Sequence, residues 1–216
     1  MPVIQSLKKL ILASAFLLPL FLSAQQALYL SPYPQEVSIA GGVFNLARKQ
    51  GIYIGKNASE QTLFAASQLL QEINDVPGME AAIQPKFKKA AIVLGLTGRD
   101  SRTDKLFASL NLSMPQQAED EGYIMNITGG RILVAAHTEA GLFYGVQTLR
   151  QLIRANRSGS SIPMLTITDW PALRYRGWMD DISRGPIPTV DFVKDCIRKM
   201  SEFKQNFLTL YTENTF

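Results

Sequence analysis

The sequence predicts an α+β sandwich, in which one sheet carries two helices on one face, followed by a single βαβ unit. Three observations support this prediction. Strand-like and helix-like stretches alternate between residues 28 and 168. Two apolar runs flank Thr128-Gly129-Gly130, which is a typical hairpin signal. Near the end of the chain an amphipathic helix separates two apolar runs, and a crossover of this kind makes the two strands parallel.

The first residues have the features of a secretory leader. Two lysines precede the apolar run Leu10–Leu22, and Ala24 is followed by the polar residue Gln25. This order of basic, apolar and small residues predicts a signal peptide over residues 1–24. A membrane anchor is the alternative, but the run is shorter than the roughly 20 residues that span a bilayer. We therefore expect an exported bacterial protein, periplasmic or extracellular, with no stable membrane insertion.

Composition excludes several classes of function. The formal net charge of +4 includes the two leader lysines, and no basic patch suggests a nucleic-acid partner. Cys196 is the single cysteine, so no disulfide can form within the chain, which fits a bacterial periplasm. His137 is the single histidine and has no carboxylate cluster beside it, so we expect a structural role. The sequence predicts neither a metal site nor a cofactor.

The first domain is predicted to span residues 25–168 and to have a mostly antiparallel sheet. Ser59 can cap its first helix, and a second helix begins near Ala140. Gly129 and Gly130 are expected to need positive φ in the hairpin turn. The expected strands are 51–54, 90–94, 123–127, 131–135 and 162–167. The apolar positions expected to face the core are Leu63, Ala66, Leu70 and Ile73 in the first helix, and Ala140, Phe143, Gln147, Leu149, Leu152 and Ile153 in the second. The spacing of Gly141 and Gly145 favours close helix packing.

The second segment, residues 169–216, is predicted to hold the βαβ unit. Residues 177–182 and 207–211 are the expected strands, and Thr189 can cap the helix between them. The expected apolar face of that helix contains Phe192, Val193, Cys196, Ile197, Met200 and Phe203. A lone βαβ unit with apolar strands is an unfinished α/β domain.

Two stretches of the sequence resemble glycoside hydrolase family 20. Tyr175–Gly185 reads Tyr-Arg-Gly-Trp-Met-Asp-Asp-Ile-Ser-Arg-Gly and is similar to the first barrel strand of that family. Pro32–Gln35 and Gly141–Leu152 resemble the non-catalytic domain that precedes the barrel. The resemblance covers nearly all of the chain after the leader. It implies that the βαβ unit is the start of a truncated TIM (β/α)8 barrel.

The resemblance also implies a substrate-binding site. The arginine of the family that matches Arg184 holds the hydroxyls of the terminal N-acetylhexosamine, and Arg184 lies just past a strand end, where barrel sites form. A guanidinium offers several donors in a rigid fork, which suits two neighbouring hydroxyls. Asp181 either supports Arg184 or contacts the substrate. Glu213 and Asn214 follow the second strand, although many family members have a second acidic residue at the position of Asn214.

The reaction implied by the family is removal of terminal β-linked N-acetylglucosamine or N-acetylgalactosamine with retention of configuration. The acetamido oxygen of the substrate acts as the nucleophile, and an adjacent Asp-Glu pair orients it and protonates the leaving oxygen. That pair follows the fourth barrel strand, so no catalytic residue is expected before Phe216 and the fragment alone is predicted to be inactive. The expected partners are glycans that contain N-acetylhexosamine.

Two other functions remain open at this stage. The chain could belong to another glycosidase family with a similar preceding domain, such as the O-GlcNAc hydrolases or α-glucuronidases, although Ser183-Arg184 argues against these. It could also be a non-catalytic carbohydrate-binding or interaction module. A chain end within a barrel argues against a natural module and favours a fragment of a longer enzyme.

Overall fold

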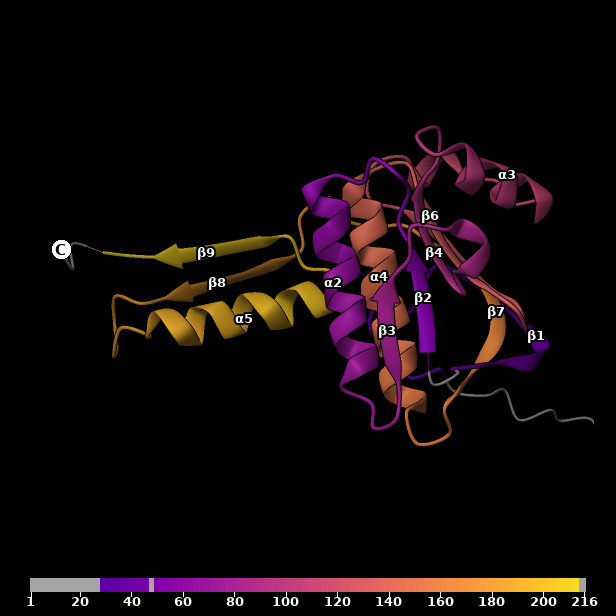
Figure 1. Ribbon diagram of the computed structural model, residues 1–216. Helices are drawn as coiled ribbons and strands as arrows, with labels where there is room; N and C mark the ends of the chain where they lie inside the picture. Colours follow the sequence, from indigo (N-terminus) through magenta and orange to yellow (C-terminus); the bar gives the residue numbers. More distant parts are fainter. Residues whose placement is uncertain (1–27, 47–48, 214–216) are drawn as a thin grey trace, which may run out of the picture.

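The computed structural model describes residues 28–46 and 49–213, arranged as a large mixed sheet with its helices and a smaller two-stranded unit beside it (Figure 1). The predicted signal peptide, residues 1–24, lies outside the described residues. No helix within the described part of the chain has both the length and the apolar character needed to cross a membrane.

The elements of the first domain follow one another in an order that alternates strands and helices. They are β1 (Glu36–Asn45), β2 (Lys49–Tyr53), α2 (Glu60–Asn74), β3 (Glu80–Ile83), η1 (Phe87–Lys89), β4 (Ile92–Leu96), α3 (Ser101–Ser109), η2 (Gln116–Ala118), β5 (Tyr123–Ile127), β6 (Ile132–Ala136), α4 (Glu139–Asn156) and β7 (Ser161–Asp169).

The sheet is mixed, and the expectation of a mostly antiparallel sheet is wrong. Its seven strands run in the order β1-β7-β5-β6-β4-β2-β3. The pairs β2–β3, β2–β4 and β4–β6 are parallel, because helices or long connections cross over between their strands. The pairs β5–β6, β5–β7 and β1–β7 are antiparallel. The parallel and antiparallel parts of the sheet meet at the β5–β6 hairpin, which the sequence predicted.

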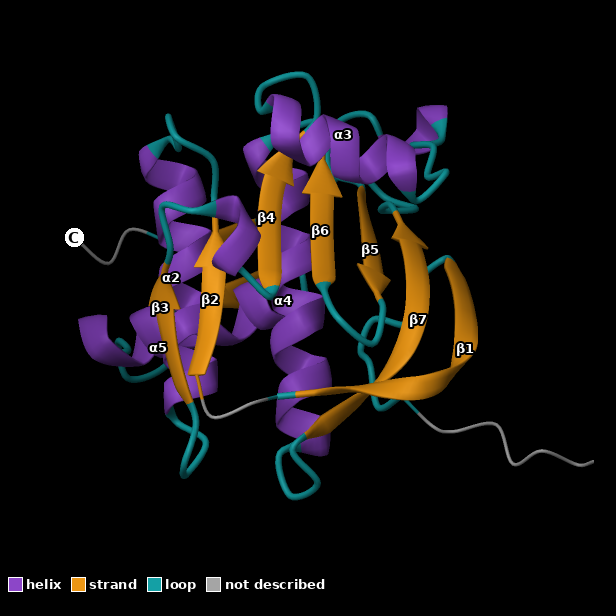
Figure 2. Cartoon of the chain, turned by 45° about the vertical axis from the view of Figure 1, so that its right-hand side comes forward, coloured by secondary structure: helices purple, strands orange, loops and turns teal. Residues whose placement is uncertain are grey.

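Helices cover both faces of the sheet, whereas the sequence predicted two helices on one face. The expected pair, α2 and α4, packs on one face over the main core. The opposite face is covered by α3, which lies across the ends of β4 and β6 in Figure 2. A second apolar cluster forms there, in which Leu106 and Phe107 pack against Val93 and Leu133. Since β4 and β6 are buried at every position, both of their faces need cover.

The helix caps were predicted correctly, whereas the buried faces of α2 and α4 were predicted only in part. Ser59 caps α2 and Thr189 caps the later helix, each through a side-chain oxygen that accepts a backbone N–H. In α2, Ala66 and Ile73 are buried as expected and Leu70 is half-buried, but Leu63 is 43% exposed. Thr62, Ala65 and Leu69, which were not predicted, are buried as well. In α4, Ala140 is exposed and Phe143 only half-buried, whereas Leu149, Leu152 and Ile153 are buried as expected.

The hairpin turn between β5 and β6 does not use positive φ at Gly129 or Gly130, contrary to the expectation. The described glycines with positive φ are Gly42, Gly55, Gly78 and Gly98. Thr128 closes the turn instead. Its N–H donates to the Arg131 carbonyl at 2.9 Å, and its hydroxyl also donates to that carbonyl, at 3.0 Å.

The βαβ unit consists of β8 (Gly177–Asp181), α5 (Val190–Glu202) and β9 (Phe207–Tyr211), and its two strands are parallel as predicted. Figure 1 shows the unit extending sideways from the first domain, beside α2 and α4. Most of its predicted apolar helix face is open: Phe192 and Ile197 are 53% and 50% exposed, and Met200 is buried. Within the described residues this sheet has two strands and no closed barrel, so the TIM barrel stays a prediction.

Candidate functional site

The C-terminal ends of β8 and β9 bring together Arg184, Asp181 and Glu213. Because the strands are parallel and Asp181 pairs with Tyr211, residues that follow the two strands meet at one rim. Arg184 Nε lies 3.6 Å from Asp181 Oδ2, and Arg184 Nη2 lies 3.6 Å from Glu213 Oε1. The two carboxylates therefore flank one guanidinium. Asn214, the fourth residue predicted for this site, lies outside the described residues.

Asp181 organises the loop that carries Arg184. The Ser183 N–H donates to Asp181 Oδ1 at 2.9 Å, and the Ser183 hydroxyl donates to the same oxygen at 2.5 Å. These hydrogen bonds, together with the charge of Arg184, hold the pKa of Asp181 below its ordinary value. One oxygen of Asp181 thus shapes the loop and the other faces Arg184, which favours support over substrate contact.

The rim has free hydrogen-bonding capacity suited to a polar ligand. The side chain of Arg184 is 73% exposed, and its separations of 3.6 Å from both carboxylates leave N–H donors for other acceptors. Glu213 Oε1 accepts a hydrogen bond of 2.8 Å from the Tyr211 hydroxyl, which raises the pKa of Tyr211. Geometry of this kind can bind hydroxyl groups through one cation and its flanking carboxylates.

His137 and possible metal ligands are further candidates for a site within the part of the chain that the structure describes. No group of three His, Cys, Asp or Glu side chains within residues 28–46 and 49–213 could hold a metal ion. His137 lies in the first domain, where its Nδ1 is 2.6 Å from Thr97 Oγ1. Its contact is local to that domain, in keeping with the structural role that we expected.

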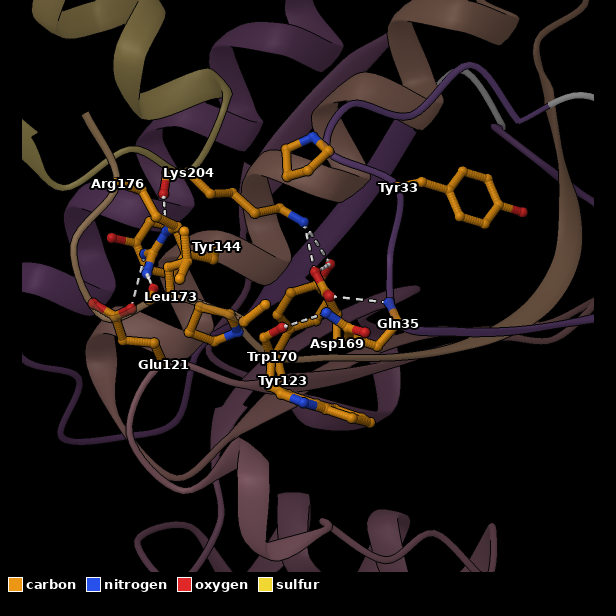
Figure 3. Close-up of a pocket in the computed structure, with 13 residues that line it drawn as sticks. Tyr33, Gln35, Glu121, Tyr123, Tyr144, Asp169, Trp170, Leu173, Arg176 and Lys204 are labelled. Atoms are coloured by element: carbon orange, nitrogen blue, oxygen red, sulfur yellow. Dashed lines mark hydrogen bonds and ion pairs between the residues drawn. The ribbon is translucent and has the colours of Figure 1, made fainter. Parts of the chain in front are cut away.

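A second polar cluster lies at the opposite, N-terminal end of the two strands, in a pocket of about 210 Å³ (Figure 3). Lys204 Nζ reaches Asp169 Oδ2 at 2.7 Å and the Tyr123 hydroxyl at 3.0 Å. Arg176 pairs with Glu121 at 2.8 Å. The sequence analysis missed this cluster because each contact joins residues far apart in the chain.

Glycines 141 and 145 hold α4 close to the sheet, as their spacing predicted. A Cβ on Gly145 would lie 2.5 Å from Val134 Cγ1 and 3.0 Å from ring atoms of Tyr123. A Cβ on Gly141 would collide with the Gly122 carbonyl oxygen. The glycines therefore allow α4 to approach β5 and β6, and this contact fixes the position of Tyr123 above the pocket.

A mixed α/β domain joined to a parallel βαβ unit, with an arginine and carboxylates at the strand ends, is the arrangement expected at the start of a glycoside hydrolase. Comparison with protein families identifies which one. The model for domain 2 of glycosyl hydrolase family 20 matches residues 27–170. The chain therefore belongs to glycoside hydrolase family 20, as the resemblance of its motifs indicated.

Individual relatives agree with this assignment. An N,N'-diacetylchitobiase of Vibrio harveyi is 28% identical over 182 residues, which are 84% of this chain and 18% of the relative. The solved N-acetyl-β-hexosaminidase of Streptomyces plicatus has a TM-score of 0.68 and 25% identity, over 85% of this chain and 34% of its own. The chain thus spans about a fifth of the first relative and a third of the second.

A further solved structure supports the fold alone. The protein described as CpGH84D superimposes with a TM-score of 0.74 but only 19% identity, over 88% of this chain and 31% of its own. The fold is therefore shared beyond close relatives, and the assignment to family 20 rests on the sequence match to its domain 2.

Proposed function

We propose that this chain is the N-terminal part of an exported β-N-acetylhexosaminidase that removes terminal β-linked N-acetylglucosamine or N-acetylgalactosamine. The family match and the names of the relatives support the enzyme class. The observation that carries the site is the position of Arg184, exposed past the end of β8 and flanked by Asp181 and Glu213. Barrel enzymes build their sites at this end of the strands.

Arg184 binds the terminal sugar in this proposal. Its fork of N–H donors spans two neighbouring ring hydroxyls, and each donor is charged, which strengthens the hydrogen bonds. Asp181 and Glu213 hold the guanidinium from two sides, and Glu213 adds a polar group at the same rim. The flanking carboxylates keep the fork pointed along the rim before the sugar arrives, which reduces the entropy lost on binding.

The chemical step belongs to groups outside these residues. Retaining hydrolysis by this family uses the acetamido oxygen of the substrate as nucleophile, assisted by an adjacent carboxylate pair. Asp180 and Asp181 are adjacent, but neighbouring strand residues point to opposite faces, and Asp181 is bound by Ser183. In this proposal the described residues contribute a sugar-binding arginine, the Asp180-Asp181 pair is not the catalytic pair, and we expect the 216 residues alone to be inactive.

Export forms part of the same proposal. The basic and apolar residues before Ala24 support a leader that is removed, which would place the enzyme in the periplasm or outside the cell. Glycans with terminal N-acetylhexosamine are the corresponding substrates, and no nucleic acid takes part.

The experiment is the substitution Arg184→Lys in the full-length protein that contains these residues. Lysine keeps the charge but lacks the fork, and a hydrogen bond to a charged group contributes about 1.5–3 kcal/mol. We expect kcat/KM on 4-nitrophenyl N-acetyl-β-glucosaminide to fall on the order of 10- to 150-fold. The matched control is Arg198→Lys, because Arg198 is similarly exposed and also pairs with an aspartate. Equal efficiency of the Arg184 variant and the control would exclude the proposed role.

A further inference from the structure

The βαβ unit has almost no core of its own. Between residues 170 and 213 only Met200 and Lys204 are buried, and one of these two is a charged side chain. The side chains on β8 and β9 are exposed or half-buried, and Trp178 and Phe207 are 45% and 49% exposed. A pair of strands with so little apolar burial is marginal by itself. Contacts with the first domain must therefore contribute to its order.

The buried lysine of the unit points into the first domain. Lys204 lies in the connection from α5 to β9, with φ at +59°, and is 6% exposed. Figure 3 shows its side chain extended toward Asp169 at the end of β7, below which lies Tyr123 of β5. The Tyr123 hydroxyl donates to Asp169 Oδ2 at 2.9 Å, so the three groups form a closed cluster. Burial lowers the pKa of Lys204, and the charge of Asp169 opposes that shift.

Two further contacts hold the starts of both strands. Arg176, just before β8, pairs with Glu121 at 2.8 Å, and its Nε donates to the Lys204 carbonyl at 2.9 Å. Asn206, just before β9, donates to the other oxygen of Glu121 at 3.1 Å. One carboxylate of the first domain therefore binds the residue just before each strand.

A third contact holds the end of α5. Arg154 of α4 pairs with Glu202 at 3.0 Å, and Gln151 donates to the Glu202 carbonyl at 2.8 Å. Burial would raise the pKa of Glu202, but the hydrogen bond and charge of Arg154 bring it below its ordinary value. The starts of β8 and β9 and the end of α5 are thus all fixed to the first domain, at one end of the unit.

We propose that the first domain acts as an assembly template for the βαβ unit. By holding both strand starts and the helix end, it sets the register in which β8 and β9 pair. A parallel pair needs such help, since its strands are joined by a long crossover and gain no local hairpin contacts during folding. The βαβ unit depends on the first domain for its order, but the first domain does not depend on the unit, because it has its own sheet and core. This role is distinct from sugar binding and does not rest on it.

The test is amide hydrogen exchange on the 216-residue chain, followed at β8 and β9 and, separately, at β5 and β6. Lys204→Met removes the buried charge and keeps the length of the side chain. Breaking a buried pair of this kind is strongly destabilising, so exchange at β8 and β9 should become about 100- to 1,000-fold faster. Exchange at β5 and β6 should stay unchanged. Lys194→Met is the matched control, because Lys194 lies on the same unit but in an exposed pair with Asp191.

A second variant keeps the test informative if Lys204→Met also disturbs Asp169. Glu121→Gln leaves the shape of the side chain and removes its charge, and it should accelerate exchange at both strands while β5 and β6 stay protected. Two results would overturn the proposal. One is unchanged protection of β8 and β9 in both variants. The other is equal loss of protection across both sheets, which would show a single cooperative unit without a template.

Discussion

Substituting Gly145 with alanine measures how closely α4 packs on the sheet. In an unobstructed helix the change would stabilise the protein by about 1 kcal/mol, because alanine has the higher helix propensity. Here the new Cβ would lie 2.5 Å from Val134 Cγ1 and 3.0 Å from the Tyr123 ring, and both neighbours are fully buried. Overpacking of a core costs about 1–3 kcal/mol. We therefore expect a net loss of up to about 2 kcal/mol.

The assay is urea unfolding followed by circular dichroism, with the midpoint and slope fitted separately. Gly130→Ala is the control, since a Cβ there meets nothing within 4 Å and the residue has no positive φ. We expect the control to change the free energy of unfolding by no more than about 0.5 kcal/mol. Stabilisation of the Gly145 variant by the full helix-propensity gain would refute the close packing of α4 against β5 and β6.

Three other predictions rest on the sequence and the structure together. The mature protein begins at or near Gln25, and N-terminal sequencing of the exported fraction would detect a start at Met1 if this is wrong. The whole chain after the leader, and a version stopped after Trp170, should both fail to hydrolyse 4-nitrophenyl N-acetyl-β-glucosaminide. The shorter version should be the more soluble because it lacks the exposed apolar face of α5. Turnover by the longer version that Asp181→Ala abolishes would show that catalytic residues lie within these 216 residues after all. The stability that Glu202 contributes is present above its ordinary pKa of 4.5 and is lost as the pH falls through its lowered pKa in the folded protein. Glu202→Gln should therefore flatten the pH dependence of the free energy of unfolding below pH 4.5. Parallel curves for the variant and the unchanged protein would contradict the pairing with Arg154.

Local signals in the sequence predicted the parts of the fold that depend on local chemistry. Ser59 and Thr189 were recognised as caps because a hydroxyl just before an amphipathic run typically accepts a backbone N–H at the start of the helix. The β5–β6 hairpin and the parallel β8–β9 pair followed from chain connectivity. The meeting of Arg184 and Glu213 at one rim then followed from that parallel pairing. Their role in sugar binding stays a prediction.

Elements that depend on distant partners were missed. The sequence Ser101–Ser109 has few apolar residues, so it gave no strong signal for helix α3. This helix covers the second face of β4 and β6, which are buried on both faces. The strand β1 contains Gly41-Gly42, which suggests a turn, but β7 pairs with it on both sides of a bulge. Leu63 was placed in the core by its spacing. The helix turns Ala65 inward beside the predicted Ala66, and these small residues allow close contact with the sheet.

The attachment of the βαβ unit at one end has a consequence for sequence change over evolution. The connection between α5 and β9 is short and includes the buried Lys204. An insertion or deletion there would move Lys204 and break its ion pair with Asp169. The connection after β8, residues 182–189, is exposed or half-buried and carries Arg184 at the other rim. Loops of that kind tolerate added residues far better than buried ones. If this rim binds sugars as we propose, new glycan preferences can arise by lengthening this end of the unit, while the opposite end keeps it anchored.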